Sequence, residues 1–425
     1  MTLLEIVQQH KQGNQNGIYS VCSAHPYVLE AAIKQAKKDN SPLLIESTSN
    51  QVDQYGGYTG MRPSDFRDFV LGLAEQNEFD TTKLILGGDH LGVNRWQNET
   101  AEEAMLKADV LIEEYVAAGF TKIHLDCSYS CSDDPIPLTD EVVAERAARL
   151  AKIAEDTAIK HFGSAERLTY VVGTEVPVPG GESEDLHDIK PTSPESARKT
   201  IQAHKDAFEK AGVIGCWDRV VGLVVQPAVE FDHSSVIDYK PEPAAELSKV
   251  VDEHENMIFE AHSTDYQATE NYSLLVRDHF AILKVGPQLT FEMREALYGL
   301  CAIENEIIPQ EERSNLRDVI ESVMLANPSN WAKYYQGTKT DQKYARSYSF
   351  SDRIRYYWAD QTIQASIDKL LNNLENKMPL PLVSQYLPEA YEAIRNGEIQ
   401  NHPKDFIINR IQKNVLEVYA RACKF

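Results

Sequence analysis

The chain has 425 residues, 42% hydrophobic and 25% charged, so it is long enough to bury a large core. Its 65 acidic residues against 42 basic ones give a formal net charge of -23, which argues against nucleic acid or an anionic membrane as the main partner. The first residues lack a secretion signal, no run approaches about 18 apolar residues, and the six cysteines form no CxxC motif, so we expect a cytoplasmic protein with free thiols.

Eight short runs rich in valine, isoleucine and leucine recur within about the first 290 residues. We expect strands over residues 17–22, 42–45, 85–88, 122–126, 168–175, 220–226, 257–261 and 280–286. Between them, helical patterns cover about 27–38, a segment opened by Pro63, and about 99–117, 139–160 and 193–211. Strands that alternate with helices indicate βαβ units, and eight of them predict a closed (β/α)8 TIM barrel.

The competing fold is a doubly wound open sheet. Against it, no GxGxxG motif opens the first helix, and polar residues follow nearly all the strands rather than those at one crevice. In a barrel, the loops after all the strands meet at one face. The side chains that we expect at this mouth are His25, Glu46, Asp89, His90, Asp126, Glu175, Gln226, His262 and Lys284.

Beyond about residue 300 the alternation of strands and helices stops. We expect the barrel to occupy residues 1–300 and a helical extension, packed on the barrel, to occupy 301–425. Its helical patterns cover about 291–306, 311–325, 361–376 and 404–421. The stretch 329–360 is aromatic and polar, and we expect it to carry Arg353 and Arg355 to the barrel mouth.

Three histidines at separate strand ends suggest a metal site. Neutral imidazoles of His90, His233 and His262 could hold a divalent ion, with Glu175 as an alternative or fourth ligand, and leave a position open for substrate. Asp89 could then move a proton while its neighbour His90 binds the metal. Any one of these histidines is more often a structural residue, but three at one predicted rim favour a metal.

Other polar residues leave alternatives open. His124 precedes Asp126 by two positions, so the two would face the same way on a strand and could form a buried hydrogen bond. His25 could bind substrate or cap a helix. Lys284 could form a Schiff base, although a phosphate contact or a salt bridge is the better interpretation. The sequence has no GxxxxGK[ST], so a P-loop kinase is unsupported.

Long motifs spread over essentially the whole chain carry a family resemblance. They are SVCSAHP (20–26), IESTSNQV (45–52), LGGDHLG (86–92), KIHLD (122–126), GTEVPVPGGE (173–182), FDHS (231–234), EAHSTDYQ (260–267), LKVGP (283–287) and SDRIRYYW (351–358). With them the sequence resembles the Z-type subunit of bacterial D-tagatose-1,6-bisphosphate aldolase. That resemblance implies a subunit that supports the activity and stability of a smaller class II catalytic subunit in galactitol or N-acetylgalactosamine breakdown, and therefore an oligomer.

The wider resemblance is to class II aldolases, which are zinc-dependent barrels. It implies that Asp89 carries a proton and that His90 and His262 bind zinc. His233 departs from the pattern, because Asp232 and Ser234 flank it where the aldolases have a glycine. The glycine-rich phosphate loop after the last aldolase histidine is also absent.

From the strand ends and the resemblance together, we expect Asp89 and Glu175 to be catalytic. For a phosphorylated ketohexose, the expected binding residues are His25, Glu46, Asn50, Asp126, Gln226, Lys284, Arg353 and Arg355.

Two functions remain open at this point. The family description favours an accessory subunit, whose immediate ligand is a protein. The retained histidines favour an enzyme, in which a metal and Asp89 would break and remake the C3–C4 bond of a ketose and so interconvert tagatose and fructose 6-phosphates. An inert barrel scaffold is a third interpretation, which so many ionisable residues at one rim disfavour.

Overall fold

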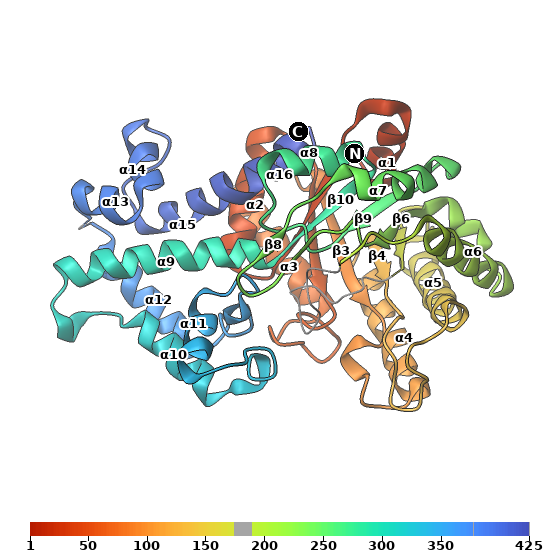
Figure 1. Ribbon diagram of the computed structural model, residues 1–425, viewed down its shortest axis with the longest axis horizontal. Helices are drawn as coiled ribbons and strands as arrows, with labels where there is room; N and C mark the ends of the chain where they lie inside the picture. The colour runs from red at the N-terminus through yellow and green to blue at the C-terminus, as the bar shows by residue number, and fades with distance from the viewer. Residues whose placement is uncertain (174–188, 377, 425) are drawn as a thin grey trace.

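A closed barrel of eight parallel strands forms the centre of the computed structural model, which describes residues 1–173, 189–376 and 378–424 (Figure 1). Around the barrel, the order is β1 (Ile18–Cys22), β10 (Phe280–Val285), β9 (Ile258–Ala261), β6 (Val220–Val225), β5 (Thr169–Val172), β4 (Lys122–Leu125), β3 (Leu84–Leu91) and β2 (Leu43–Thr48). β2 also pairs with β1, which closes the barrel. The predicted (β/α)8 fold is confirmed, and the open-sheet alternative is wrong.

Helices follow the barrel strands in chain order. They are α2 (Pro26–Asp39), α3 (Pro63–Gln76), α4 (Ala101–Ala117), α5 (Asp140–Phe162), α6 (Pro194–Lys210), α7 (Pro241–Ser248), α8 (Thr269–Arg277) and α9 (Pro287–Ile307). Many begin where the sequence provides a cap or a first-turn proline. Oγ1 of Thr100, for example, accepts the backbone N–H of Glu103, and the backbone N–H of Thr100 donates to the Glu103 carboxylate. Between β6 and α7, a two-stranded ribbon joins β7 (Glu230–Phe231) to β8 (Val236–Ile237).

The chain begins with α1 (Leu3–Gln9), and further helices follow the barrel. These are α10 (Leu316–Ala326), α11 (Lys339–Tyr348), α12 (Gln361–Leu374), α13 (Leu380–Tyr386), α14 (Pro388–Arg395), α15 (Pro403–Ile411) and α16 (Glu417–Ala422). α15 packs on α2 and α9, whereas α16 packs on α8 and β1, so the last helices return to the barrel (Figure 1). α9 runs across residue 300, and the division of the chain there stays a prediction.

Sequence patterns located the long helices better than the short ones. The helix expected over 404–421 is α15 and α16 joined by a π-helical turn at Gln412–Leu416. No helix was expected at α13 and α14, which are short and rich in proline at their starts. In both helices the prolines stand in the first turn, where no intrahelical N–H is needed.

The barrel interior carries a buried layer of charge. Successive strand residues point to opposite faces, so Lys122 and His124 of β4 share one face. Lys122 lies 2.5 Å from Oε1 of Glu46 and 2.6 Å from Oε2 of Glu260, with all three side chains fully buried. This layer supports the strand ends on which the site is built. The six cysteines are free thiols, as expected.

Candidate metal centre

Four donor side chains meet at the carboxyl ends of three barrel strands. Asp89 and His90 lie at the end of β3. His124 lies in β4, and His262 follows directly after β9. One donor atom from each residue lies within 4.8 Å of the donor atoms of the other three. Imidazole and carboxylate donors suit a divalent ion such as zinc, and we call these four residues the metal cluster.

The backbone before the cluster is shaped by close contacts. A Cβ atom on Gly87 would lie 2.7 Å from Cγ of Glu46, so only glycine fits beside that side chain. His90 has a φ of 48°, in the left-handed region that few residues with side chains adopt. Such strain often occurs at functional sites. The ring centroids of His90 and His262 are 5.0 Å apart.

Asp126 orients His90. Nδ1 of His90 donates to Oδ2 of Asp126 over 2.6 Å, which leaves Nε2 of the ring for a ligand. Burial raises the pKa of Asp126, but the hydrogen bond and the charge of His90 act in the opposite direction and outweigh burial. The pKa of Asp126 therefore falls from 3.8 to about 2. A carboxylate that holds the far nitrogen of an imidazole is a common partner of metal-binding histidines. The Asp126 carboxylate therefore orients the His90 ring.

His124 places a second ring nitrogen beside Asp89. Its Nε2 donates to the carbonyl oxygen of Gly173 over 3.2 Å, so Nδ1 carries the lone pair. That Nδ1 accepts the backbone N–H of His90 and lies 3.1 Å from Oδ1 of Asp89. Two acceptors at this distance repel one another, and the ammonium of Lys284, 2.7 Å from Oδ1 of Asp89, supplies a positive charge beside them. A divalent ion bound by the ring nitrogens of His90, His124 and His262 would add positive charge at the same place.

Lys284 holds Asp89 in its ionised form. Its ammonium lies 2.7 Å from Oδ1 of Asp89 and also pairs with Glu46. Burial raises the pKa of Asp89, but the charges of His90 and Lys284 hold it well below its usual value. Cys22, Glu46 and Asp89 form a second group of close donor atoms, and the Lys284 ammonium pairs with both of its carboxylates.

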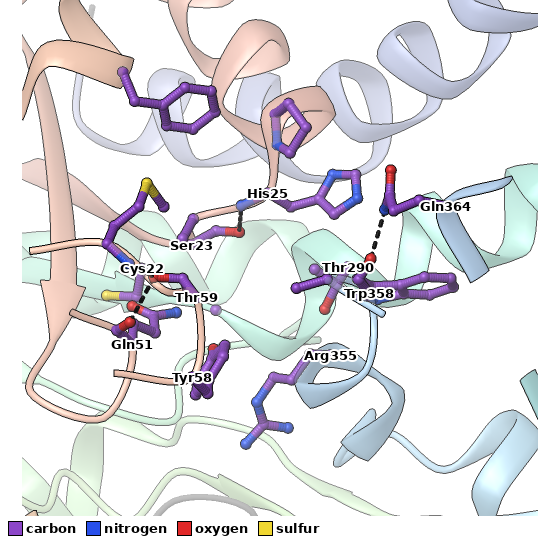
Figure 2. Close-up of a pocket in the computed structure, with 16 residues that line it drawn as sticks. Cys22, Ser23, His25, Gln51, Tyr58, Thr59, Thr290, Arg355, Trp358 and Gln364 are labelled. Carbon is purple, nitrogen blue, oxygen red and sulfur yellow. Dashed lines mark hydrogen bonds between the residues drawn. The ribbon is translucent and has the colours of Figure 1, made fainter. Parts of the chain in front are cut away.

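A cavity of about 200 Å³ gives access to the cluster. Asp89, His90 and His262 line it, and 14% of the His90 side chain is exposed. Among the other residues expected to bind substrate, the lining includes Asn50, Lys284 and Arg355. Glu46 and Asp126 do not line the cavity but contact residues that do. His25 lines a neighbouring cavity (Figure 2). We call the first of these the metal cavity.

His233 lies outside the metal cluster. Its Nδ1 lies 3.2 Å from Oγ of Ser351, and its Nε2 donates to the carbonyl oxygen of Tyr334 over 3.1 Å. The ring is thus fixed against the segment after α10, and His233 belongs to no described group of metal donors. Of the expected set His90, His233 and His262, the structure brings His90 and His262 together, with His124 and not His233 as the third histidine.

Two other expected residues, Gln226 and Arg353, do not line the metal cavity. Oε1 of Gln226 accepts the N–H of Val229 within its own loop. The guanidinium of Arg353 lies 3.3 Å from the ring centroid of Tyr334 and donates to the carbonyl oxygen of Asn330. Glu175 lies outside the described residues.

The sequence analysis missed His124 as a donor and Gln51 and Tyr58 as lining residues. The spacing of His124 and Asp126 carried a signal, since two residues apart on a strand face the same way. Gln51 and Tyr58 stand in a loop, where no periodicity marks the direction of a side chain.

Asp265 yields a prediction about pH. Its Oδ1 accepts the N–H groups of Gly286 and Gln288 over 3.1 and 2.8 Å, and burial raises its pKa from 3.8 to about 6. The folded state holds this proton more tightly than the unfolded state does. The free energy of unfolding therefore falls as pH rises from about 4 to about 6, and it stays lower at higher pH. Asp265→Asn keeps the acceptor and removes the charge.

We expect Asp265→Asn to stabilise the metal-free chain by up to about 3 kcal/mol at about pH 8 and by little at about pH 4. Thermal melting of both proteins at the two pH values measures the difference. An equal shift at both pH values would show that ionisation of Asp265 is not the cause.

Among the described residues, no helix is both long enough and apolar enough to cross a bilayer. A family model described as "D-tagatose-1,6-bisphosphate aldolase subunit GatZ/KbaZ-like" matches residues 3–424. The chain is similar to a solved structure of a probable tagatose 6 phosphate kinase from Sinorhizobium meliloti 1021. The two share 46% identity at a TM-score of 0.88, over 96% of this chain and 100% of the other.

Two solved aldolase structures are more distant. The YdjI aldolase from Escherichia coli K12 matches at 12% identity and a TM-score of 0.43, over 86% of this chain and 96% of its own. A fructose-bisphosphate aldolase from Campylobacter jejuni matches at 14% identity and a TM-score of 0.44, over 88% and 93%. Likenesses at these scores carry no argument about this chain.

Proposed function

The chain belongs to the D-tagatose-1,6-bisphosphate aldolase subunit GatZ/KbaZ-like family, and from this premise we propose that it works as a Z-type subunit beside a class II catalytic aldolase subunit. The family match over residues 3–424 carries this proposal. In this role the chain supports the activity and stability of its partner in the cytoplasm, during breakdown of galactitol or N-acetylgalactosamine. The 46% identity to a protein named a kinase does not extend the proposal to a P-loop kinase, because the sequence has no P-loop motif.

Co-expression with the cognate catalytic subunit tests the subunit role. We expect the two chains to co-purify, and we expect the complex to show higher and longer-lived aldolase activity than the catalytic subunit alone, because a bound partner stabilises the folded state. The control is the catalytic subunit expressed with an unrelated barrel protein. Unchanged activity and lifetime in the presence of this chain would contradict the role.

A second activity is supported by the metal cluster. We propose that His90, His124 and His262 hold a divalent ion, with zinc the expected metal, and that Asp89 lies beside it. Three imidazoles that leave a position open are typical of catalytic rather than structural zinc sites. When bound, such an ion supplies Lewis-acid polarisation of a carbonyl oxygen. The cavity at the cluster provides room for a small substrate.

The reaction that these residues suit is retro-aldol epimerisation at C4 of a ketohexose 6-phosphate. The Asp89 carboxylate takes the proton of the C4 hydroxyl, the C3–C4 bond breaks, and C4 becomes an aldehyde. The electron pair of that bond stays on the three-carbon fragment at C3. Attack on the other face of the aldehyde re-forms the bond, and Asp89 returns the proton to the C4 oxygen. The product is the C4 epimer.

Lys284 and Asp126 act as positioning residues in this account. Lys284 keeps Asp89 ionised and in place, and Asp126 fixes the ring of His90. A coupled assay of the zinc-loaded chain for interconversion of tagatose and fructose 6-phosphates tests the activity. Absence of turnover with zinc bound would contradict the epimerase activity, and the subunit role would then be the only proposed function.

A further inference from the structure

Glu260 adjoins the metal cluster and has no part in the proposed reaction. It is the third residue of β9 and precedes His262 by two positions, and both side chains are buried, with 0% of Glu260 and 2% of His262 exposed. Nε2 of His262 donates to Oε1 of Glu260 over 2.9 Å. Because an ionised carboxylate only accepts, Nε2 carries the hydrogen, and the lone pair of the neutral ring is on Nδ1.

Lys122 holds the other oxygen of Glu260. The ammonium of Lys122 lies 2.6 Å from Oε2 of Glu260, and the Lys122 side chain is fully buried. By contrast, Nζ of Lys284 and Nδ1 of His124 lie 3.9 and 4.0 Å from Oε1 of Glu260. The two short contacts therefore use the two oxygens separately, one for Lys122 and one for His262. An ammonium can only donate, so the orientation of the carboxylate is fixed from both sides.

The three histidines of the metal cluster share one arrangement. One nitrogen of each ring donates to a fixed oxygen, and the acceptors are Asp126 for His90, the carbonyl oxygen of Gly173 for His124, and Glu260 for His262. A neutral imidazole that donates from one nitrogen can offer the other to a metal, and metal-binding histidines usually have such a partner. Glu260 thus stands to His262 as Asp126 stands to His90.

We propose that Glu260 is a positioning residue of the metal cluster, which keeps the hydrogen of His262 on Nε2 and so presents Nδ1 to the metal. Lys122 in turn holds Glu260 in the orientation that this requires. The inference rests on the proposed function for the identity of the metal ligands, but the state of the His262 ring can be measured without metal. It gives a role to two buried residues that contact neither substrate nor metal.

Replacing Glu260 with glutamine tests this role, because an amide has only one acceptor oxygen. The Lys122 ammonium attracts that oxygen and repels the amide NH₂ group. The NH₂ group then faces Nε2 of His262, which must accept, so the ring hydrogen moves to Nδ1. We expect zinc affinity to fall about 10- to 100-fold, the usual loss when the outer partner of a metal ligand is removed.

Two measurements read the outcome. Nitrogen NMR of the metal-free chain with isotope-labelled histidine shows which ring nitrogen carries the hydrogen, and the His262 signals are those absent from His262→Gln. We expect the hydrogen on Nε2 in the unaltered chain and on Nδ1 in Glu260→Gln. Competition with a chromophoric chelator measures the zinc affinity of both proteins.

A second substitution separates positioning from a general loosening of the fold. In the double variant Lys122→Met, Glu260→Gln, no ammonium competes for the amide oxygen, so this oxygen can accept from Nε2 of His262 again. We expect the hydrogen to return to Nε2 and the double variant to bind zinc more tightly than Glu260→Gln. Removing both members of a buried ion pair also costs less stability than removing one, so the double variant decides if the single variant fails to fold.

Glu304→Gln is a matched control for loss of a buried carboxylate. Glu304 is 1% exposed on α9, and it accepts hydrogen bonds from the backbone N–H and the hydroxyl of Ser314. We expect this variant to change neither the His262 ring nor zinc affinity. Equal loss of zinc affinity in Glu304→Gln and Glu260→Gln would show a general effect of removing a buried carboxylate and would overturn the inference.

Other results overturn it in distinct ways. If Glu260→Gln folds, keeps the hydrogen on Nε2 and binds zinc as the unaltered chain does, the inference is wrong and the proposed metal site stands. A double variant that binds zinc no better than Glu260→Gln would show that Lys122 does not act through the orientation of Glu260. If the unaltered chain binds no zinc, the proposed metal site fails, and the position of the hydrogen alone decides whether Glu260 sets the His262 ring.

Discussion

Replacing Asp89 with asparagine is expected to lower epimerisation of ketohexose 6-phosphates by about 10²–10⁴-fold, the usual contribution of a general base. Asparagine keeps the shape of the side chain but cannot accept the C4 hydroxyl proton. The three histidines of the metal cluster remain, so zinc should stay bound with little loss. Single-turnover rates and zinc content, measured on the same preparation, separate the two effects.

The same variant distinguishes the two proposed roles. If the chain is also an accessory subunit, Asp89→Asn should activate its catalytic partner as well as the unaltered chain does. Asp156→Asn, in an exposed ion pair with Lys152 on α5, is a matched control for loss of a carboxylate. Because Asp89 also pairs with Lys284, the melting temperature of the variant must be compared with that of the unaltered chain. Full epimerase activity in a folded Asp89→Asn protein removes Asp89 from the mechanism.

The second large effect concerns the two histidines on which sequence and structure disagree. His124→Gln is expected to weaken zinc binding by at least about 100-fold, because it removes one of the three proposed ligands, and loss of even an outer partner costs about 10- to 100-fold. His233→Gln should leave zinc affinity unchanged, since the His233 ring is held by Ser351 and Tyr334. Competition with a chromophoric chelator measures both affinities.

Each variant serves as the other's control, because each replaces one histidine with glutamine. Catalysis offers a second readout, in which His124→Gln should be inactive and His233→Gln active. Equal loss of zinc in the two variants would mean that both residues reach the metal. Loss in His233→Gln alone would restore the ligand set expected from sequence.

The barrel could be predicted from sequence because each strand has a recognisable pattern within a few consecutive residues. The apolar run ending at Gly87 and Gly88 is a buried strand in any context, and eight such runs alternating with helices allow few topologies. The positions of Asp89, His90 and Lys284 followed from the same signals, since residues at the carboxyl ends of parallel strands must meet at one face.

Contacts between distant segments could not be predicted in the same way. His233 stands in a loop, and its direction is set by residues more than a hundred positions later, where the N–H of Phe350 donates to its carbonyl oxygen over 3.1 Å. His124 lies inside a strand, so its direction follows from alternation, but its role depends on Asp89 and Gly173 from neighbouring strands. The cavity lined by His25 likewise depends on Trp358 and Arg355, which follow the barrel in the sequence.

Anomalous diffraction at the zinc edge, from crystals of the zinc-loaded chain, tests the central claim most directly. We expect one anomalous peak at the carboxyl ends of β3, β4 and β9, at bonding distance of about 2.0–2.1 Å from a ring nitrogen of each of His90, His124 and His262. A peak at His233, or no peak at this position in crystals that contain zinc elsewhere, would contradict the account.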